Sequence, residues 1–121
     1  MIEAVLLDLD DTLVAFDAVT DRAWEAVLRP YCEERRLDPD ALQRAIRRVS
    51  DAWWSDPERH RQGRLDMQAT RRRLVTEAFD GLGLPAGEAV EVADRYGRVR
   101  LDLMYLLPGA LETLAALRAA G

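Results

Sequence analysis

The hydrophobic residues of this chain follow two patterns, a short continuous run near the start and a helical repeat over most of the remaining sequence. Residues 4–7 with Leu9 form the continuous run, which is typical of a strand buried on both faces in a parallel sheet. From Val19 onward, apolar residues recur three or four positions apart, which predicts helices. The positions that define these helices are Val19, Ala23, Trp24 and Val27; Leu42, Ala45, Ile46, Val49 and Trp53; Thr70, Leu74, Ala78 and Phe79; Val90, Ala93, Tyr96, Val99 and Leu103; and Leu111, Leu114 and Leu117.

Proline, glycine and aspartate mark the boundaries between the expected helices. Pro30 is expected to kink or end the first helix, and Asp38-Pro39-Asp40 is a start signal for the second. Ser55-Asp56-Pro57 ends that second helix, which leaves residues 55–64 as a polar connector. The third helix is expected over residues 65–79 and the fourth over 87–105. Leu107-Pro108-Gly109 then precedes a last helix that closes at Gly121.

This order of elements, one strand followed only by helices, is incomplete as an α/β fold. An isolated strand leaves its backbone N–H and C=O groups unpaired, and a sheet needs roughly three or more strands to be stable. In α/β folds, a helix that ends in glycine commonly leads into the next strand. We therefore expect the N-terminal portion of a longer α/β protein, mostly helical over these 121 residues.

Composition narrows the classes of partner. The 121 residues are 49% apolar, enough for one core, and the formal net charge of -5 disfavours binding to nucleic acid or to an anionic membrane. All 17 basic residues are arginine. The single cysteine, Cys32, excludes an internal disulfide and a thiolate metal cluster and fits a reducing compartment. With no secretory signal pattern and no apolar stretch of membrane-spanning length, we expect a cytoplasmic location.

Candidate chemistry lies in VLLDLDDTL, residues 5–13, where three carboxylates follow the apolar run. Asp8 and Asp10 stand two residues apart at the carboxyl end of the expected strand, where open α/β sheets bind ligands. Neighbouring carboxylates repel each other, and a hard cation such as magnesium or calcium offsets that repulsion. A calcium-binding EF-hand is excluded because Leu13 and Val19 would occupy its required Gly and Glu positions. The alternative is that these acids only cap a helix.

These residues carry a resemblance to a known family. Val5-Leu6-Leu7-Asp8-Leu9-Asp10-Asp11-Thr12-Leu13 resembles the first motif of the haloacid dehalogenase-like hydrolase superfamily, an apolar strand followed by Asp-x-Asp-x-Thr. The helical block resembles the α-helical cap that one large subgroup inserts after this motif, and the segment 105–114 resembles the return into the core domain. The resemblance implies that residues 1–16 and 105–121 are parts of a Rossmann-like α/β core domain, and that residues 17–104 are a helical cap domain.

The resemblance also implies roles for single residues. Asp8 would be the nucleophile that forms an aspartyl-phosphate, and Asp10 would be the general acid and then the general base. The Asp8 carboxylate and the Asp10 backbone carbonyl would hold Mg²⁺, and Thr12 would help to fix the loop at the substrate site. Asp11 is expected to be a turn or capping residue. Because dehalogenases of the superfamily lack the second aspartate, Asp10 favours a phosphatase.

The function that the resemblance implies is a magnesium-dependent phosphoric monoester hydrolase acting on a small phosphorylated metabolite. A dehalogenase or a phosphomutase of the same superfamily is the alternative, and a non-catalytic helical interaction module is an alternative of another class. Later motifs of the family supply a Ser or Thr, a Lys (occasionally an Arg) and a pair of acids, and this chain contains no lysine. We expect those motifs after Gly121 and little or no activity from the 121 residues alone. The pattern does not predict an oligomeric state.

Other polar and aromatic residues have weaker assignments. Arg61 and Arg64 in the polar connector are candidates for binding an anionic substrate, although a solvated loop is the simpler interpretation. The three consecutive arginines 71–73 are expected on a solvated helix face. Trp53 fits the apolar face of its helix, and Cys32 fits a small apolar position in the core.

Overall fold

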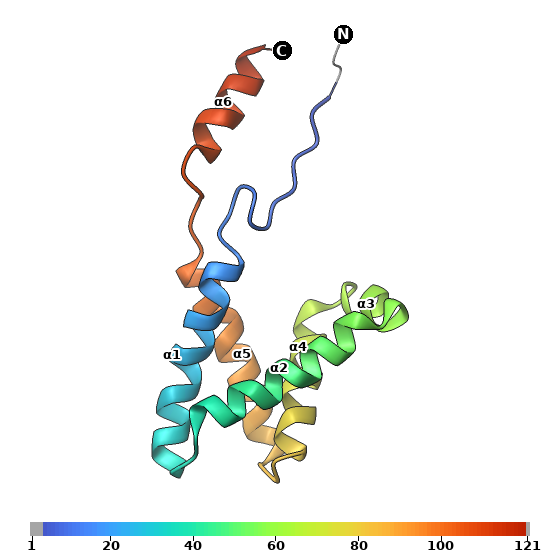
Figure 1. The fold of residues 1–121 in the computed structure, drawn as a ribbon, viewed down its shortest axis with the longest axis vertical. Coiled ribbons are helices and arrows are strands. Elements are labelled where there is room, and N and C mark those ends of the chain that lie inside the picture. The colour runs from blue at the N-terminus through green and yellow to red at the C-terminus, as the bar shows by residue number, and fades with distance from the viewer. Residues whose placement is uncertain (1–3, 121) are drawn as a thin grey trace.

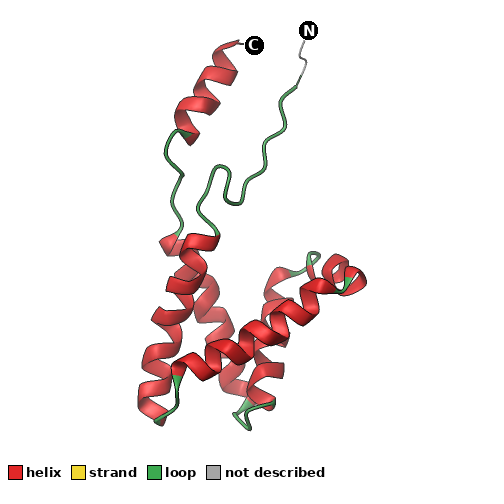
Figure 2. Cartoon of the chain, viewed as in Figure 1, coloured by secondary structure: helices red, strands yellow, loops and turns green. Residues whose placement is uncertain are grey.

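The computed structural model describes residues 4–120, and its regular structure is helical (Figure 1, Figure 2). The helices are α1 (Asp17–Arg35), α2 (Pro39–Ser55), α3 (Pro57–Gly63), α4 (Met67–Asp80), α5 (Ala86–Leu103) and α6 (Ala110–Ala120). The prediction of a mostly helical chain is confirmed, and the bounds of α4 and α5 lie within two residues of those expected. None of the described helices combines the length and the hydrophobicity needed to cross a membrane.

Aspartate side chains begin three of these helices. At the start of α2 the carboxylate of Asp38 accepts a hydrogen bond from the Asp40 amide at 2.9 Å. Asp56 and Asp66 cap α3 and α4 in the same way, with amide-to-carboxylate distances of 2.8 and 2.9 Å. Each bond satisfies an amide that the first helical turn leaves without a partner, so these acids determine where the helices start.

The structure places α3 where the sequence predicted a polar connector, so that prediction is wrong over residues 57–63. Asp56 and the proline after it repeat the start signal of α2, and a short polar helix follows from it. Gly63 closes this helix against two tryptophans. A Cβ at Gly63 would lie 2.9 Å from ring atoms of Trp53 and Trp54, so only glycine fits at this close approach.

Helix α1 continues through Pro30, where the sequence predicted a kink or an end. Proline inside a helix costs about 3 kcal/mol, because it removes one backbone hydrogen bond and its ring crowds the preceding turn. Around Pro30, however, Val27, Leu28 and Tyr31 are buried in the core, and burial of each such side chain contributes roughly 1.5–3 kcal/mol. Burial therefore outweighs the proline, and the predicted end is wrong. The helix ends instead at Arg35, and the next residue, Arg36, has a left-handed φ of 55°.

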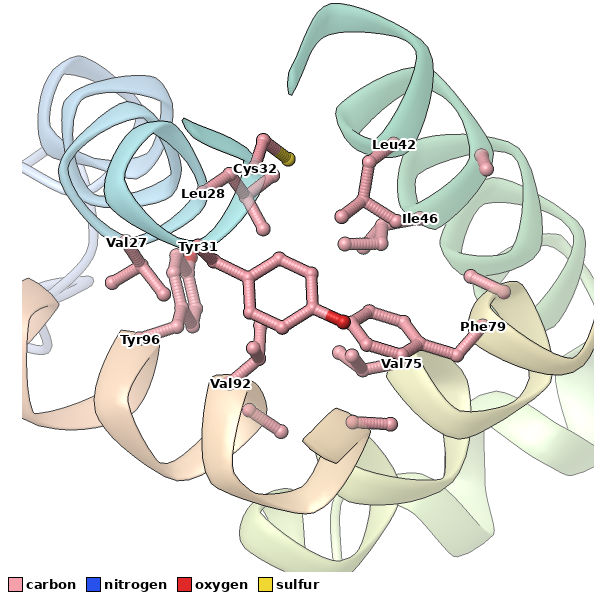
Figure 3. Close-up of a cluster of buried hydrophobic side chains, with 14 of the residues drawn as sticks. Val27, Leu28, Tyr31, Cys32, Leu42, Ile46, Val75, Phe79, Val92 and Tyr96 are labelled. Atoms are coloured by element: carbon pink, nitrogen blue, oxygen red, sulfur yellow. The ribbon is translucent and has the colours of Figure 1, made fainter. Parts of the chain in front are cut away.

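The core lies between α1, α2, α4 and α5, and Figure 3 shows its side chains pointing toward one another from these four helices. Phe79 and Leu28 are 0% exposed, and the ring of Tyr31 lies 5.5 Å from that of Phe79, centroid to centroid. Cys32 is a free thiol in the same cluster and is fully buried. The helical block from α1 to α5 thus encloses its own hydrophobic core.

A polar cluster joins α1 to α5 at the edge of this core. The Tyr31 hydroxyl donates a hydrogen bond to the Glu88 carboxylate at 2.7 Å, and Arg35 Nε donates to the same carboxylate at 3.0 Å. Burial and then the bond to Glu88 raise the pKa of Tyr31 to about 12. The bonds from Tyr31 and Arg35 hold the pKa of Glu88 below its usual value.

Both ends of the described chain stand apart from this block (Figure 1). Residues 4–9 are exposed, with Leu6 at 95%, and the predicted strand does not form. Within residues 4–120 the β-type pairing is limited to the isolated bridges Asp10–Val14 and Val14–Leu106. A strand gains its stability from hydrogen bonds to neighbouring strands, and the described residues contain no neighbouring strand for residues 4–9. The described residues therefore do not form the Rossmann-like core. Helix α6 likewise contacts none of the other described helices.

Candidate active site

Residues 9–14 form a tight loop that contains Asp10 and Thr12 of the predicted site. The Leu9 carbonyl accepts hydrogen bonds from the amides of Leu13 and Val14 at 3.0 and 3.1 Å. The Asp11 amide donates to the Val14 carbonyl at 2.8 Å, which closes the loop from the other side. Asp11 has a left-handed backbone with φ of 55°, a conformation that aspartate adopts more readily than most residues.

The carboxylate of Asp11 ties this loop to the first turn of α1. Its Oδ1 accepts hydrogen bonds from the amides of Phe16 at 2.8 Å and Asp17 at 3.1 Å. Phe16 itself, at the cap position of α1, supplies no side-chain bond, so Asp11 takes over that task from five residues upstream. The prediction that Asp11 is a turn or capping residue is confirmed.

Asp8, Asp10 and Thr12 are exposed around the same loop. Asp8 comes directly before the loop, and Asp10 lies within it, at the bridge to Val14. The Thr12 amide makes a long hydrogen bond of 3.4 Å to the Leu9 carbonyl. The loop thus presents Asp8 and Asp10 to solvent while it uses Asp11 for its own structure. Their roles as nucleophile, general acid and loop residue stay predictions.

Asp8 and Asp10 provide the hard oxygen donors that Mg²⁺ prefers. This ion is held by one or two carboxylates together with water and substrate phosphate oxygens. Residues 4–120 contain no group of three or more His, Cys, Asp or Glu side chains arranged to hold a metal. The two aspartates therefore fit part of the donor set that Mg²⁺ prefers.

Two hydrogen bonds hold the loop beside the segment that comes after α5. The Ala15 amide donates to the Tyr105 carbonyl at 2.9 Å, and the Leu107 amide donates to the Leu13 carbonyl at 2.9 Å. Figure 1 shows these two segments leaving the same end of the helical block. The candidate site therefore lies where α1 begins and α5 has ended.

A cavity of about 700 Å³ lies between α1, α2, α4 and α5. Its wall includes Phe16 and Asp17, the residues whose amides bind Asp11, so the cavity begins directly after the loop. Deeper in the wall, the rings of Trp24 and Tyr96 stack with centroids 3.8 Å apart and planes 13° apart. A concave wall that combines aromatic and apolar side chains with charged ones suits a small organic ligand with a polar group.

Arginines from α4 and α5 also line this cavity. The guanidinium carbon of Arg71 lies 5.4 Å from the Tyr96 ring centroid, and that of Arg100 lies 4.3 Å from the Phe16 ring centroid. Neither arginine takes part in the ion pairs found within residues 4–120. Burial, and then the positive charge of Arg100, lower the pKa of Arg71. The cavity wall thus holds two arginines that form no ion pair within residues 4–120, together with Asp17 and Asp51, which form none either.

The structure places Arg61 and Arg64 outside the cavity wall. Arg61 lies on α3, where it is exposed and forms an ion pair with Glu58 one turn away. Arg64 comes directly after the same helix and is exposed. Their assignment to substrate binding stays a prediction.

Arg71 is one cavity residue that the sequence interpretation missed, because the three arginines of α4 were all expected to be solvated. Arg72 instead donates two hydrogen bonds to Asp94, at 2.7 and 2.8 Å, and Arg71 is half-buried in the cavity wall. The prediction of a solvated face is wrong for Arg71. A signal was present in the spacing, since Arg71 stands four residues after Met67 and three before Leu74, on the inward face of the helix.

Comparison with known proteins identifies a family. The family model of the haloacid dehalogenase-like hydrolases matches residues 2–121. Neither the search of curated proteins nor the search of solved structures found a match. Because the family match spans nearly the whole chain, the Asp8–Thr12 loop and the helical block included, the chain belongs to the haloacid dehalogenase-like hydrolases.

Proposed function

We propose that this hydrolase is a magnesium-dependent phosphoric monoester hydrolase that acts on a small phosphorylated metabolite through an aspartyl-phosphate on Asp8. The observation that carries the proposal is that neighbouring aspartates differ in their hydrogen bonding. Asp11 is occupied by the amides of Phe16 and Asp17, two residues that also line a cavity of ligand size, while Asp8 and Asp10 stay exposed to solvent. Family membership supports hydrolysis, and Asp10 supports a phosphate substrate over a haloacid.

In the proposed reaction, Asp8 and Asp10 act in turn. A carboxylate oxygen of Asp8 attacks phosphorus and forms a new P–O bond, while the ester P–O bond breaks and the leaving alkoxide takes a proton from Asp10. The Asp10 carboxylate then accepts a proton from water, which attacks the aspartyl-phosphate and releases inorganic phosphate and free Asp8. The Asp8 carboxylate and the Asp10 carbonyl would hold Mg²⁺, which when bound neutralises charge on the phosphoryl group.

The proposal divides the chain where two backbone hydrogen bonds join its connecting segments. Residues 1–16 and 105–121 are assigned to the core domain, and residues 17–104 to the cap. The two segments that would connect them are held together by the bonds between Ala15 and Tyr105 and between Leu13 and Leu107. A cytoplasmic location also belongs to the proposal, because Cys32 is a buried free thiol that fits a reducing compartment.

The chain contains no lysine, the residue that the family uses to balance the phosphoryl charge. We therefore expect the 121 residues alone to release little or no phosphate from p-nitrophenyl phosphate with MgCl₂. Turnover of the purified chain at about 1 s⁻¹ or faster, within the usual range of enzymes, would contradict this expectation.

The test of the proposed mechanism replaces single aspartates in the complete protein. Asp8→Asn should abolish phosphate release, and Asp10→Asn should lower kcat by about 10²–10⁴-fold because proton transfer is lost. Asp80→Asn, an exposed aspartate at the end of α4, is the matched control and should keep full activity.

Other outcomes would favour the alternatives. Retained phosphatase activity in Asp8→Asn would remove the proposed nucleophile. Halide release from 2-chloropropionate without phosphatase activity would indicate a dehalogenase, and phosphate transfer between sugar positions would indicate a phosphomutase. Absence of all three activities, with partner binding unchanged in Asp8→Asn, would indicate an interaction module.

A further inference from the structure

The cavity between α1, α2, α4 and α5 contains charged groups that the proposed reaction does not use. The proposed phosphoryl transfer uses Asp8 and Asp10, whereas Arg71 on α4 and Arg100 on α5 line the cavity. These two helices pack directly against each other. Both arginines line the same cavity. The positive charge of Arg100 also lowers the pKa of Arg71, because like charges disfavour each other.

The carboxylates around this pair are bound to other arginines or form no salt bridge with Arg71 or Arg100. Asp21 in the cavity wall forms an ion pair with Arg47 at 2.6 Å. Asp94 accepts two hydrogen bonds from Arg72 on α4. Asp17 and Asp51 also line the cavity, but within residues 4–120 neither forms an ion pair with Arg71 or Arg100. The two guanidinium groups therefore have no salt-bridge partner within residues 4–120, so both can pair with the carboxylate of a ligand.

Gly97 makes room for the guanidinium of Arg71 on α5. A Cβ at this position would stand 2.4 Å from Arg71 Nη1, closer than atoms can approach. With glycine there, Arg71 lies against the helix beside Tyr96, at the stacked pair of Trp24 and Tyr96. The position of the Arg71 guanidinium thus depends on the lack of a side chain at Gly97.

We infer that this cavity binds an organic carboxylate with an apolar or aromatic body, the carboxylate being held by Arg71 and Arg100. A planar guanidinium pairs with a carboxylate through two parallel hydrogen bonds, and the aromatic wall takes the body of the ligand. As a statement about substrate, the inference rests on the proposed function. Since Phe16 and Asp17 connect the loop to the cavity, the substrate class is a phosphate monoester with a carboxylate at its far end.

The direct test measures binding to the 121-residue chain, with phenylacetate as probe and phenylacetamide as its neutral counterpart. Trp24 and Trp54 both line the cavity, so tryptophan fluorescence reports occupancy, and calorimetry gives the affinity. Phenylacetate should bind saturably and at least about tenfold more tightly than the amide, because only the carboxylate forms charge-assisted bonds.

Variants locate the site. Arg71→Gln and Arg100→Gln should each weaken phenylacetate binding by about tenfold or more. Gly97→Ala should also weaken it while the fold is kept, because it only displaces the flexible end of Arg71. Arg73→Gln and Arg98→Gln are matched controls on the same two helices; both residues are exposed and lie outside the cavity wall, so binding should not change. Circular dichroism and the urea midpoint check that every variant is folded.

Several results would overturn the inference. The first is equal affinity for phenylacetate and phenylacetamide, and the second is unchanged phenylacetate affinity in folded Arg71→Gln and Arg100→Gln. The third is no phenylacetate binding at 10 mM, about the concentration at which even a weak specific site would be filled. Asp8→Asn should bind phenylacetate as the unaltered chain does. Loss of the proposed phosphatase mechanism would therefore leave this result intact, and failure of binding would leave the Asp8 test intact.

The substrate statement has its own readout in the complete protein. 4-Carboxyphenyl phosphate should have a KM at least about tenfold below that of 4-carbamoylphenyl phosphate, and Arg71→Gln should remove this difference with kcat little changed. Equal KM values for the two esters in the unaltered protein would refute the assignment of the carboxylate-bearing class.

Discussion

The helical block and the two ends of the chain are both rich in apolar residues, yet they bury them to very different degrees. Within the block, Phe79 and Leu28 are fully buried, whereas Leu6 near the N-terminus is 95% exposed and Leu111 on α6 is 61% exposed. A helix satisfies its backbone hydrogen bonds within its own segment, so α1 to α5 need only one another's side chains. A strand needs the backbone of a neighbour, and residues 4–9 have none within the described chain.

This difference indicates that the stability of the described chain resides in the block. Side chains of α1, α2, α4 and α5 form one cluster, and the ends are attached to it by a few hydrogen bonds at the loop and the connecting segments. Substitutions in the two regions should therefore have unequal effects on the free energy of unfolding.

The largest effect is expected from Phe79→Ala, which empties the centre of the block. Truncation of a fully buried phenylalanine costs about 3–5 kcal/mol through lost burial and the cavity left behind. Leu6→Ala removes a side chain that is already in water and should change stability by less than about 0.5 kcal/mol. Urea unfolding followed by circular dichroism measures both. Similar losses in the two variants would show that the N-terminal segment shares the core.

A smaller difference in stability is expected between substitutions of two capping aspartates, Asp38 inside the block and Asp11 at its edge. Asp38→Ala removes the cap of α2 and should lower stability by about 0.5–2 kcal/mol. Asp11→Ala should instead leave the urea midpoint almost unchanged and speed hydrogen exchange at the Phe16 and Asp17 amides, because these lose their acceptor. A fall in the urea midpoint equal to that of Asp38→Ala would place the loop within the cooperative unit.

The subtlest effect concerns pH and the cluster that joins α1 to α5. The pKa of Glu88 is lowered by Tyr31 and Arg35, so its contribution to stability is present above the unfolded pKa of about 4.3 and is lost as the pH falls through the folded value. Glu88→Gln should therefore flatten the acid side of a plot of urea midpoint against pH. The pKa of Tyr31 is raised to about 12, so its contribution is lost as the pH rises from about 10 toward that value. If the urea midpoint falls with the same slope at acidic pH in Glu88→Gln and in the unaltered chain, the Glu88 carboxylate does not contribute to the pH dependence of stability.

Local signals in the sequence predicted much of the fold and part of the site. Start signals such as Asp38 and the apolar spacing of α4 and α5 act within a few residues, so the helices could be predicted, and so could the capping role of Asp11. Features that depend on distant residues could not be predicted. Helix α1 passes Pro30 because other helices bury its flanks, and Arg71 lies in a cavity because Gly97, on a different helix, leaves space for it.

The capping bond of Asp11 has a consequence for how this sequence tolerates change. Positions 10 and 11 hold the same amino acid, but position 11 needs only a short acceptor that adopts a left-handed backbone, which asparagine also provides. If Asp10 transfers protons as proposed, asparagine cannot replace it there. A saturation library should therefore accept asparagine at one of two identical neighbours and reject it at the other. A sequence alignment shifted by one residue here would therefore match the structural position 11 of this chain with the proposed catalytic position 10 of another.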